Sequence, residues 1–560
     1  MDIPNITNIH STVSVTKLLV ISAICPLVWI VVRWTRNHDP REPSYIHPSI
    51  PFIGHLIGMI RYGAKYFEYV KFVSSTLTQK HDTIDLADLH SARRNHPIFT
   101  LPILNSRNYI IADATIAGQI QRNNKTLSFY SIIVEVTRRL IAFDENAARI
   151  TFDNINGDKG PGGLMEAVHE MLNRHLAPGV ALDAMTAVQM RKTGEMLEME
   201  VPMGEGSVEV DLYAWLRHIF SVCNAEAIYG PQNIFAVHPE LEEEFWKFED
   251  GMLGLVIDVV PQITARKAFY SRKRVLGGLI EYVETGAYKK ASPLIQERVS
   301  TNLNFGIGEQ MSGHAELILM FGILGNAVPS NFWLVANIFS RPTILARVRE
   351  EVEAAIRVSQ QSNDENDEKS PNGRRQCFIS SKVITKLCPL LYGCYRETLR
   401  DVSLLTSARL VTEDTVAGDR YLLRKNSVVQ IAGGVLHHSS DIWGHDANDF
   451  NPDRFLSFEG NADKAQASPL PKGVPSAAFR AFGGGTVICP GRHFAQSELM
   501  TLAAVLSVGF HLTEPNGDPL KLPQKDEERI PLAMVKPKWD PKVKVSRRKD
   551  WEEVHWIVTV

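Results

Sequence analysis

Apolar positions recur at three- and four-residue steps along most of the chain from about Tyr66 onward, and this spacing predicts amphipathic helices. The pattern is clear over residues 162–176 and 241–260. Near 99–112 and 408–431, apolar and polar residues alternate instead, which predicts short β-strands. We therefore expect a mainly α protein with small β-sheets.

The longest apolar stretch of the body covers residues 315–339 and raises two alternatives, a membrane span or a long buried helix. Glu316 and three asparagines lie within it, and each is costly in lipid. Pro329 also interrupts the run. A long buried helix of a large helical protein fits better, and its polar residues then need partners or a function.

The N-terminus carries a separate apolar run, in which Lys17 is the one charged residue between Ser11 and Val32. A helix over residues 11–32 would extend about 33 Å, enough to cross a bilayer, so we expect a transmembrane anchor. Arginines follow the run, which places residues 1–10 in the lumen and the rest in the cytoplasm. A cleaved signal peptide fits less well, because the run is long and no small-residue cleavage site stands out. With this orientation, Asn5 in the triplet NIT is a glycosylation acceptor.

The chain after the anchor divides by composition. Proline-rich residues 33–55 favour an extended hinge that leads into a single large domain over 56–560. Residues 359–376 are polar, charged and nearly free of apolar side chains, which predicts a disordered surface insertion.

Charge and cysteine usage exclude several classes of function. The 560 residues carry 60 basic and 63 acidic side chains, with no concentrated basic region of the kind that binds nucleic acid. No pair of the six cysteines has CxxC spacing, which argues against a zinc or iron–sulfur site. Their scatter along a long chain predicts free thiols in a reducing compartment.

One cysteine stands in an unusual setting. Cys489 follows the glycines at 483–485, and helical spacing begins just after it. A lone cysteine is usually inert packing, but glycines let a backbone approach a bound group closely, and a helix N-terminus stabilises a thiolate. A phosphate-binding loop is excluded because no Lys-Ser/Thr pair follows the glycines.

The segment Phe482–Gly491, FGGGTVICPG, resembles the haem-binding signature FxxGxxxCxG of the cytochrome P450 family. The resemblance implies the cytochrome P450 fold, with haem b as cofactor and the Cys489 thiolate as axial ligand of its iron. It also implies that Phe482, Gly485 and Gly491 help to bind the cofactor.

Three further elements stand upstream in the order found in that family. Glu397 and Arg400 lie at i and i+3, where they share a helix face and can pair; alone, such a pair is commonplace. Residues 451–455, NPDRF, resemble the family's PxRF element, whose arginine, here Arg454, joins that ion pair. Arg409 stands where the family places a cation against a haem propionate, and a guanidinium suits a carboxylate.

Two departures from the family pattern bear on mechanism. Val487 stands where most members have a basic residue for a propionate, and no Trp-x-x-x-Arg is found in the third helix, for which the segment near His169 is a weak substitute. In the long central helix, Gly325 and Asn326 replace the usual acid and threonine. The GNxxPxxFW run that they begin resembles the branch of sterol 7α-hydroxylases and prostacyclin synthase.

This resemblance implies a monooxygenase that hydroxylates or otherwise oxidises a lipophilic molecule such as a sterol, terpenoid or other secondary metabolite. Asn326 cannot act as an acid near neutral pH but can orient a water that relays protons. If no external proton is needed, the alternative is an isomerase or dehydratase of a peroxide substrate. A haem-binding sensor without turnover is the alternative outside the enzymes.

The remaining expectations concern partners. No GxGxxG motif opens a βαβ unit, so electrons must come from another protein, which the resemblance identifies as a membrane-anchored NADPH–cytochrome P450 reductase. The resemblance also implies the endoplasmic reticulum membrane, with one span and a cytoplasmic catalytic domain. We expect a mostly apolar substrate pocket that residues 402–405 and the surroundings of Asn326 face.

Overall fold

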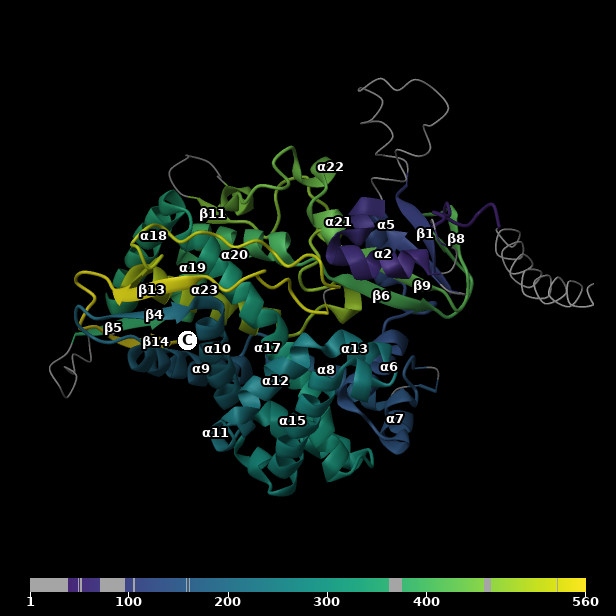
Figure 1. Cartoon of the computed structure of the whole chain (residues 1–560), viewed down its shortest axis with the longest axis horizontal. Helices are drawn as coiled ribbons and strands as arrows, with labels where there is room; N and C mark the ends of the chain where they lie inside the picture. The colour runs from purple at the N-terminus through teal and green to yellow at the C-terminus, as the bar shows by residue number, and fades with distance from the viewer. Residues whose placement is uncertain are drawn as a thin grey trace, which may run out of the picture.

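The computed structural model describes residues 39–70, 96–361, 375–457 and 465–560, apart from residues 49, 51, 52, 104, 105, 158, 161 and 531. The predicted lumenal segment 1–10 with Asn5, the predicted anchor 11–32 and most of the predicted insertion 359–376 lie outside the described residues. Within them the fold is mostly helical with small sheets, as the sequence predicted (Figure 1).

Most helices lie to the left of and below the largest sheet, whereas α2, α5 and α21 lie beside its strands (Figure 1). Their bounds are α2 Gly54–Tyr62, α5 Ala114–Arg122, α6 Tyr130–Ile141, α7 Glu145–Phe152, α8 Leu164–Leu176, α9 Val180–Glu200, α10 Leu212–Tyr229, α11 Ile234–Val237, α12 Glu240–Asp250, α13 Met252–Ile257, α14 Pro261–Thr264, α15 Arg266–Glu284, α16 Pro293–Asn304, α17 Glu309–Phe339, α18 Pro342–Gln361, α19 Ser381–Leu387, α20 Pro389–Val402, α21 Gly433–His437, α22 Ser440–Trp443 and α23 Arg492–Gly509.

The strands form five small sheets. The largest has the order β1-β2-β9-β6-β3, in which β2 and β9 are parallel neighbours. The others have the orders β12-β13-β4, β10-β11, β14-β5 and β7-β8. The strand bounds are β1 Ile98–Ile103, β2 Ser106–Ile111, β3 Leu127–Ser128, β4 Ser207–Asp211, β5 Gln376–Ser380, β6 Thr406–Val411, β7 Thr415–Ala417, β8 Tyr421–Leu423, β9 Val428–Ala432, β10 Leu456–Ser457, β11 Gln466–Ala467, β12 Phe510–Thr513, β13 Lys542–Arg547 and β14 His555–Thr559.

Helix α17 is the long apolar helix that the sequence predicted. It runs for 31 residues, through Pro329, and most of its side chains are buried. By length and composition it is the one helix of the described part of the chain that could cross a membrane. However, 67% of its most apolar window is buried within the protein, against α10, α15, α20 and α23. It is therefore the central helix of the core, as the sequence favoured.

The predicted helix over 241–260 is broken in the structure. α12 ends at Asp250, and α13 follows from Met252. A Cβ at Gly251 would lie 2.5 Å from the Cβ of Ala268 in α15, so this glycine permits a close contact between the two segments. The apolar periodicity continues across the break, which is why the sequence showed one helix.

The described part of the predicted hinge lies against the sheet. The Thr100 N–H of β1 donates to the Ser44 carbonyl at 2.8 Å, and the Ile46 N–H donates to the Thr100 carbonyl at 3.0 Å. The Glu42 carboxylate is fully buried and pairs with Arg107 at 3.1 Å. The boundaries drawn from composition stay predictions.

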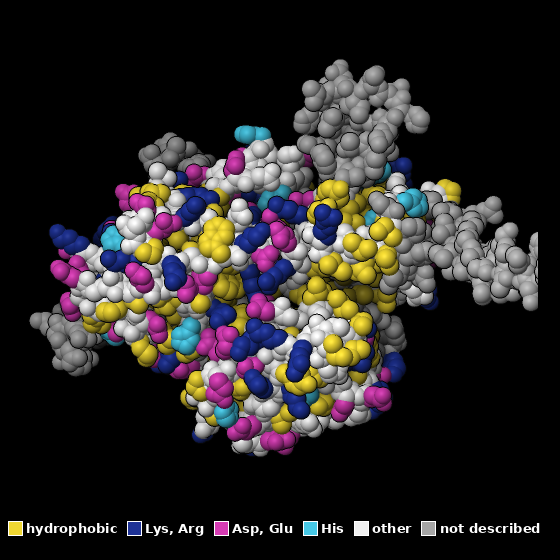
Figure 2. Space-filling view, viewed as in Figure 1, with side chains coloured by type: hydrophobic (Ala, Val, Ile, Leu, Met, Phe, Trp, Pro, Cys, Tyr) yellow, Lys and Arg dark blue, Asp and Glu magenta, His cyan; other side chains and the backbone are white. Residues whose placement is uncertain are grey.

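Large apolar side chains are exposed on one part of the surface. Figure 2 shows hydrophobic side chains gathered over α2 and α13. They include Ile57 and Ile60 of α2, Ile257 at the end of α13, and Val260 and Ile263 at α14. We call these residues the apolar patch.

Candidate functional site

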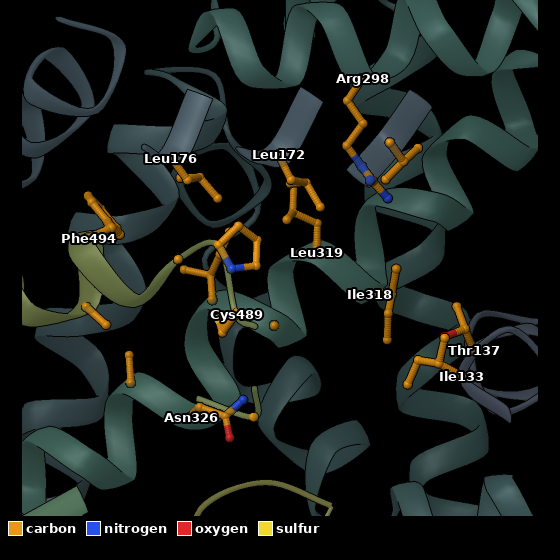
Figure 3. Close-up of a pocket in the computed structure, with 18 of the residues that line it drawn as sticks. Ile133, Thr137, Leu172, Leu176, Arg298, Ile318, Leu319, Asn326, Cys489 and Phe494 are labelled. Atoms are coloured by element: carbon orange, nitrogen blue, oxygen red, sulfur yellow. The ribbon is translucent and has the colours of Figure 1, made fainter. Parts of the chain in front are cut away.

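A cavity of about 560 Å³ lies in the middle of the helical part, between α6, α8, α16, α17 and the loop before α23 (Figure 3). Most of its lining side chains are aliphatic or aromatic. Cys489 comes from the loop and Asn326 comes from α17 (Figure 3). Phe482 of the same loop also lines the cavity. The sequence-predicted residues Cys489, Phe482, Gly491 and Asn326 thus line one apolar space.

The glycines shape the loop that presents Cys489. Gly483 and Gly485 have φ of 72° and 68°, in the left-handed region that favours glycine. A Cβ on Gly485 would lie 2.6 Å from the Gln121 carbonyl oxygen, so Gly485 packs against the end of α5. The Cys489 N–H donates to the Phe482 carbonyl at 2.9 Å and closes the loop. The sulfur is thereby held on the cavity wall.

Cys489 differs from the other described cysteines. Cys223, Cys377, Cys388 and Cys394 are buried, whereas Cys489 is accessible, and none of the five forms a disulfide. Cys489 is accessible from the cavity, but the protein around it removes water from the thiol and so raises its pKa. The N–H groups of Gly491 and Arg492 lower this pKa. The sequence expected the helix N-terminus to favour a thiolate, but in the structure desolvation outweighs it. A coordinated metal ion deprotonates a thiol outright and would supply what the helix lacks.

Asn326 has one fixed orientation. Its Oδ1 accepts the Met534 N–H at 3.2 Å, so the atom on that side must be the oxygen. Figure 3 shows its nitrogen on the side of Cys489. Because Pro329 has no N–H, the Gly325 carbonyl also lacks its helical partner. The helix therefore offers an amide donor toward the cavity, and one of its backbone carbonyls lacks the regular helical donor.

Two buried arginines lie near each other by the cysteine loop. Arg409 of β6 donates from Nη1 to the Asn124 Oδ1 at 3.2 Å and to the Leu127 carbonyl, but its Nε has no partner among the described residues. Arg480 is equally buried, and its Nη1 lacks a described partner. Burial, and then the charge of Arg409, lower the pKa of Arg480 to about 10.

Two buried, like-charged guanidinium groups with unsatisfied donors require an anion. The two propionates of haem are such anions, and the cavity with its accessible thiol adjoins the same loop. The residues present therefore fit haem b, with Arg409 and Arg480 as the groups that would hold its carboxylates.

Arg480 is a residue that the sequence analysis missed. Its N–H donates to the Nε2 of the buried His437 at 2.7 Å, and the other ring nitrogen of His437 bonds the Ser403 carbonyl at 3.0 Å. The sequence signal that could have identified Arg480 is its charge within the otherwise apolar segment FRAF, two residues before Phe482. Val487 stands where most members of the family have a basic residue for a propionate. Arg480 would bind that carboxylate instead.

The predicted ion-pair residues meet in the structure. Glu397 and Arg400 of α20 are fully buried and form two short contacts, of 2.7 and 2.8 Å. The Arg454 Nε lies 3.4 Å from the same carboxylate, which also accepts the Asn451 N–H at 3.0 Å. Arg400 further donates to the carbonyls of His437 and Ala447. One carboxylate thus ties α20 to the segment that precedes the cysteine loop.

Of the other predicted positions, some line the cavity and others do not. Leu405 lines the cavity, whereas Val402 is buried in the core. On α8, the cavity face carries Met165, Val168 and Leu172, and His169 bonds Asn173 instead. The described residues hold no cluster of three His, Cys, Asp or Glu side chains that could bind a metal ion.

Comparisons with known proteins point the same way. The family model Cytochrome P450 matches residues 320–541. The chain is similar to Cytochrome P450 monooxygenase nodJ of Hypoxylon pulicicidum, with 28% identity over 96% of each chain. It is also similar to 25-hydroxycholesterol 7-alpha-hydroxylase of Rattus norvegicus, with 25% identity over 72% of this chain and 92% of the relative.

Among solved structures, the retinoic acid bound cyanobacterial CYP120A1 has a similar fold, with a TM-score of 0.63 and 17% identity over 91% of this chain and 100% of that one. The family model, the relatives and the similar fold all indicate a cytochrome P450, as does the cysteine loop on the cavity wall. The chain therefore belongs to the cytochrome P450 family, has a relationship to its sterol 7α-hydroxylases, and is a monooxygenase.

Proposed function

We propose that this monooxygenase inserts oxygen into a lipophilic small molecule, with haem b held by Cys489 and electrons supplied by an NADPH–cytochrome P450 reductase. One observation carries the proposal: the Cys489 sulfur and the Asn326 amide line the same apolar cavity (Figure 3). When bound there, haem b supplies the activation of dioxygen that insertion of one oxygen atom requires.

The residues of the chain would hold the cofactor by its iron and by its carboxylates. Cys489 would ligate the iron, and Phe482 and Gly491 line the cavity beside it. Arg409 and Arg480 would bind the carboxylates. Glu397, Arg400 and Arg454 would keep the preceding segment in place, since a buried carboxylate that joins two arginines fixes their relative position.

Asn326 would orient a water that carries protons into the cavity. Its Oδ1 is occupied by the Met534 N–H, so Nδ2 is the free end and can donate to a water oxygen. An amide has no proton to give near neutral pH, so the water is the proton carrier in this proposal.

The substrate is of the sterol, terpenoid or secondary-metabolite class. The aliphatic lining supports it, because an apolar ligand gains free energy from leaving water in such a space. The similarity to 25-hydroxycholesterol 7-alpha-hydroxylase of Rattus norvegicus, whose name gives a sterol as substrate, supports a sterol-like member of this class.

We also propose association with the endoplasmic reticulum membrane through the predicted anchor. The apolar patch over α2 and α13 supports this, because exposed aliphatic side chains near the described start of the chain suit contact with lipid (Figure 2). Flotation of the full chain with vesicles, compared with a variant that carries Ile57→Ser, Ile60→Ser and Ile263→Ser, tests the contribution of the patch.

Product analysis in cells that express the chain with a reductase tests the proposed oxidation. Mass spectrometry should find a product that is heavier by one oxygen atom, and Cys489→Ala should abolish it. Turnover of a peroxide substrate without NADPH would instead indicate an isomerase. Haem binding without NADPH consumption, for any substrate in the panel, would indicate a sensor.

A further inference from the structure

The cavity has a polar corner at its end away from Cys489. Arg298 and Asn302 stand one turn apart on α16, and both line the cavity. Figure 3 shows the Arg298 side chain directed toward Ile318, with Leu172 and Leu319 between it and Cys489. A cation and an amide in an otherwise aliphatic lining need a partner.

Arg298 is held firmly by α17. Its Nε donates to the Glu316 carboxylate at 2.9 Å, and its Nη2 donates to the Ala315 carbonyl at 2.8 Å. Glu316 is fully buried and Arg298 nearly so. The second terminal nitrogen, Nη1, donates to no group among the described residues, so one arm of a rigid guanidinium remains free at the cavity wall.

Asn302 supplies a second free donor. Its side chain is 97% buried, with 3% exposed, and its Nδ2 has no hydrogen-bond partner in the described part of the chain. A buried amide donor without a partner is costly, so such a group indicates a missing acceptor. Two donors without acceptors thus meet at one corner.

The charge at this corner is already balanced. Glu316 neutralises Arg298, so an anionic group would bring an unpaired charge into a buried site. A neutral oxygen, in a hydroxyl or a carbonyl group, accepts from both donors at no such cost.

The corner is separated from Asn326 by a defined distance. Ala315 and Asn326 are 11 residues apart on α17, which at about 1.5 Å per residue is about 16 Å along the helix. The wall between them carries Ile318, Leu319 and Ile323. This shape suits an elongated apolar molecule with oxygen at one end.

We propose that Arg298 and Asn302 form a subsite for a neutral hydroxyl or carbonyl oxygen at one end of the substrate, and so set which distant carbon is oxidised. The proposal rests on the oxidation proposed above and names the polar feature that its substrate must carry.

Binding of matched ligands tests the subsite on the haem-loaded full chain. Cholestanone, cholestanol and cholestane share one skeleton and differ in the oxygen at one end; hexadecanol and hexadecane form a flexible pair. Affinities come from thermal shift and from the Soret change on titration. We expect the oxygenated member of at least one set to bind about 10- to 100-fold more tightly, because a site built to donate rejects an analogue without an acceptor.

Three variants identify the source of that preference. Asn302→Leu keeps the branching of the side chain without its donor, and Arg298→Lys keeps the charge beside Glu316 without the free Nη1. Each should reduce the preference by about tenfold. Ile307→Val, at a buried position that also lines the cavity, is the matched control and should leave the ratio unchanged.

The outcomes separate clearly. Equal affinity within both ligand sets would overturn the subsite, since water alone would then satisfy the donors. An unchanged ratio in Asn302→Leu and Arg298→Lys, with the native Soret spectrum, would overturn it as well. A preference that these variants abolish, in a chain that forms no oxidised product, would support the subsite and refute the proposed oxidation.

Discussion

Neutralising Glu397 should destabilise the protein far more than neutralising Asp453, although each carboxylate pairs with an arginine. Glu397 contacts Arg400 at 2.7 Å with both side chains fully buried. Asp453 contacts Arg347 at the same distance, but both side chains are about half exposed, at 49% and 48%. The variants Glu397→Gln and Asp453→Asn therefore compare a buried carboxylate that joins two arginines with an exposed one that pairs with Arg347.

The magnitude follows from what each substitution leaves behind. Glu397→Gln leaves Arg400 buried without a counter-charge, whereas Arg454 keeps Asp446 at 3.0 Å. Removing one partner of a buried pair costs about 3–5 kcal/mol. Arg400 keeps its bonds to the carbonyls of His437 and Ala447, which favours the lower part of that range. Asp453→Asn removes a surface pair, which contributes about 0–1 kcal/mol.

Thermal unfolding measures the difference. With about 2.1 cal/mol/K of unfolding entropy per residue, a chain of 560 residues has about 1.2 kcal/mol/K in total. Glu397→Gln should thus lower the Tm by about 3 °C and Asp453→Asn by less than about 1 °C. Equal shifts for the two variants would refute the argument that one buried carboxylate holds this region.

Three further predictions concern the cavity. Asn326→Thr should preserve turnover if a water relays the protons, whereas Asn326→Leu should oxidise NADPH with little product, because it removes the donor and leaves the Met534 N–H unpaired; NADPH consumed per product formed measures this. Arg480→Met should speed haem transfer to apomyoglobin by about tenfold or more, with Arg480→Lys intermediate; equal rates in all three proteins would contradict the assignment. Burial raises the pKa of Glu498 to about 8, so its folded form holds a proton that the unfolded form has lost, and stability should fall as the pH rises from about 4.5 to about 8. Glu498→Gln should flatten that pH dependence of the Tm, and a wild-type slope retained in this variant would contradict it.

The sequence predicted those parts of the site whose residues are close together in the chain. Glu397 and Arg400 are three residues apart on one helix, so their spacing alone predicts that they can pair. Phe482 to Gly491 form one contiguous loop, so its residues are close together in any fold. Helix α17 was predictable for a similar reason, since its apolar length exceeds what a surface helix needs.

The parts that the sequence did not predict depend on contacts between distant segments. The role of Arg480 emerges only beside Arg409 of β6, and the donors of Arg298 and Asn302 matter only because the cavity reaches them. The break between α12 and α13 lies at Gly251, which contacts Ala268 of another helix. Local sequence shows the helix that follows Cys489, whose N–H groups lower the pKa of the thiol, but not the burial that raises it.

The carbon monoxide spectrum of the reduced full-length protein tests the central claim most directly, because it reports the atom that binds iron. If Cys489 ligates haem as a thiolate, the spectrum shows the red-shifted Soret band of a thiolate-ligated haem, and Cys489→Ala loses it. A histidine-type Soret band in the wild-type protein, or purified protein that binds no haem, would contradict the account.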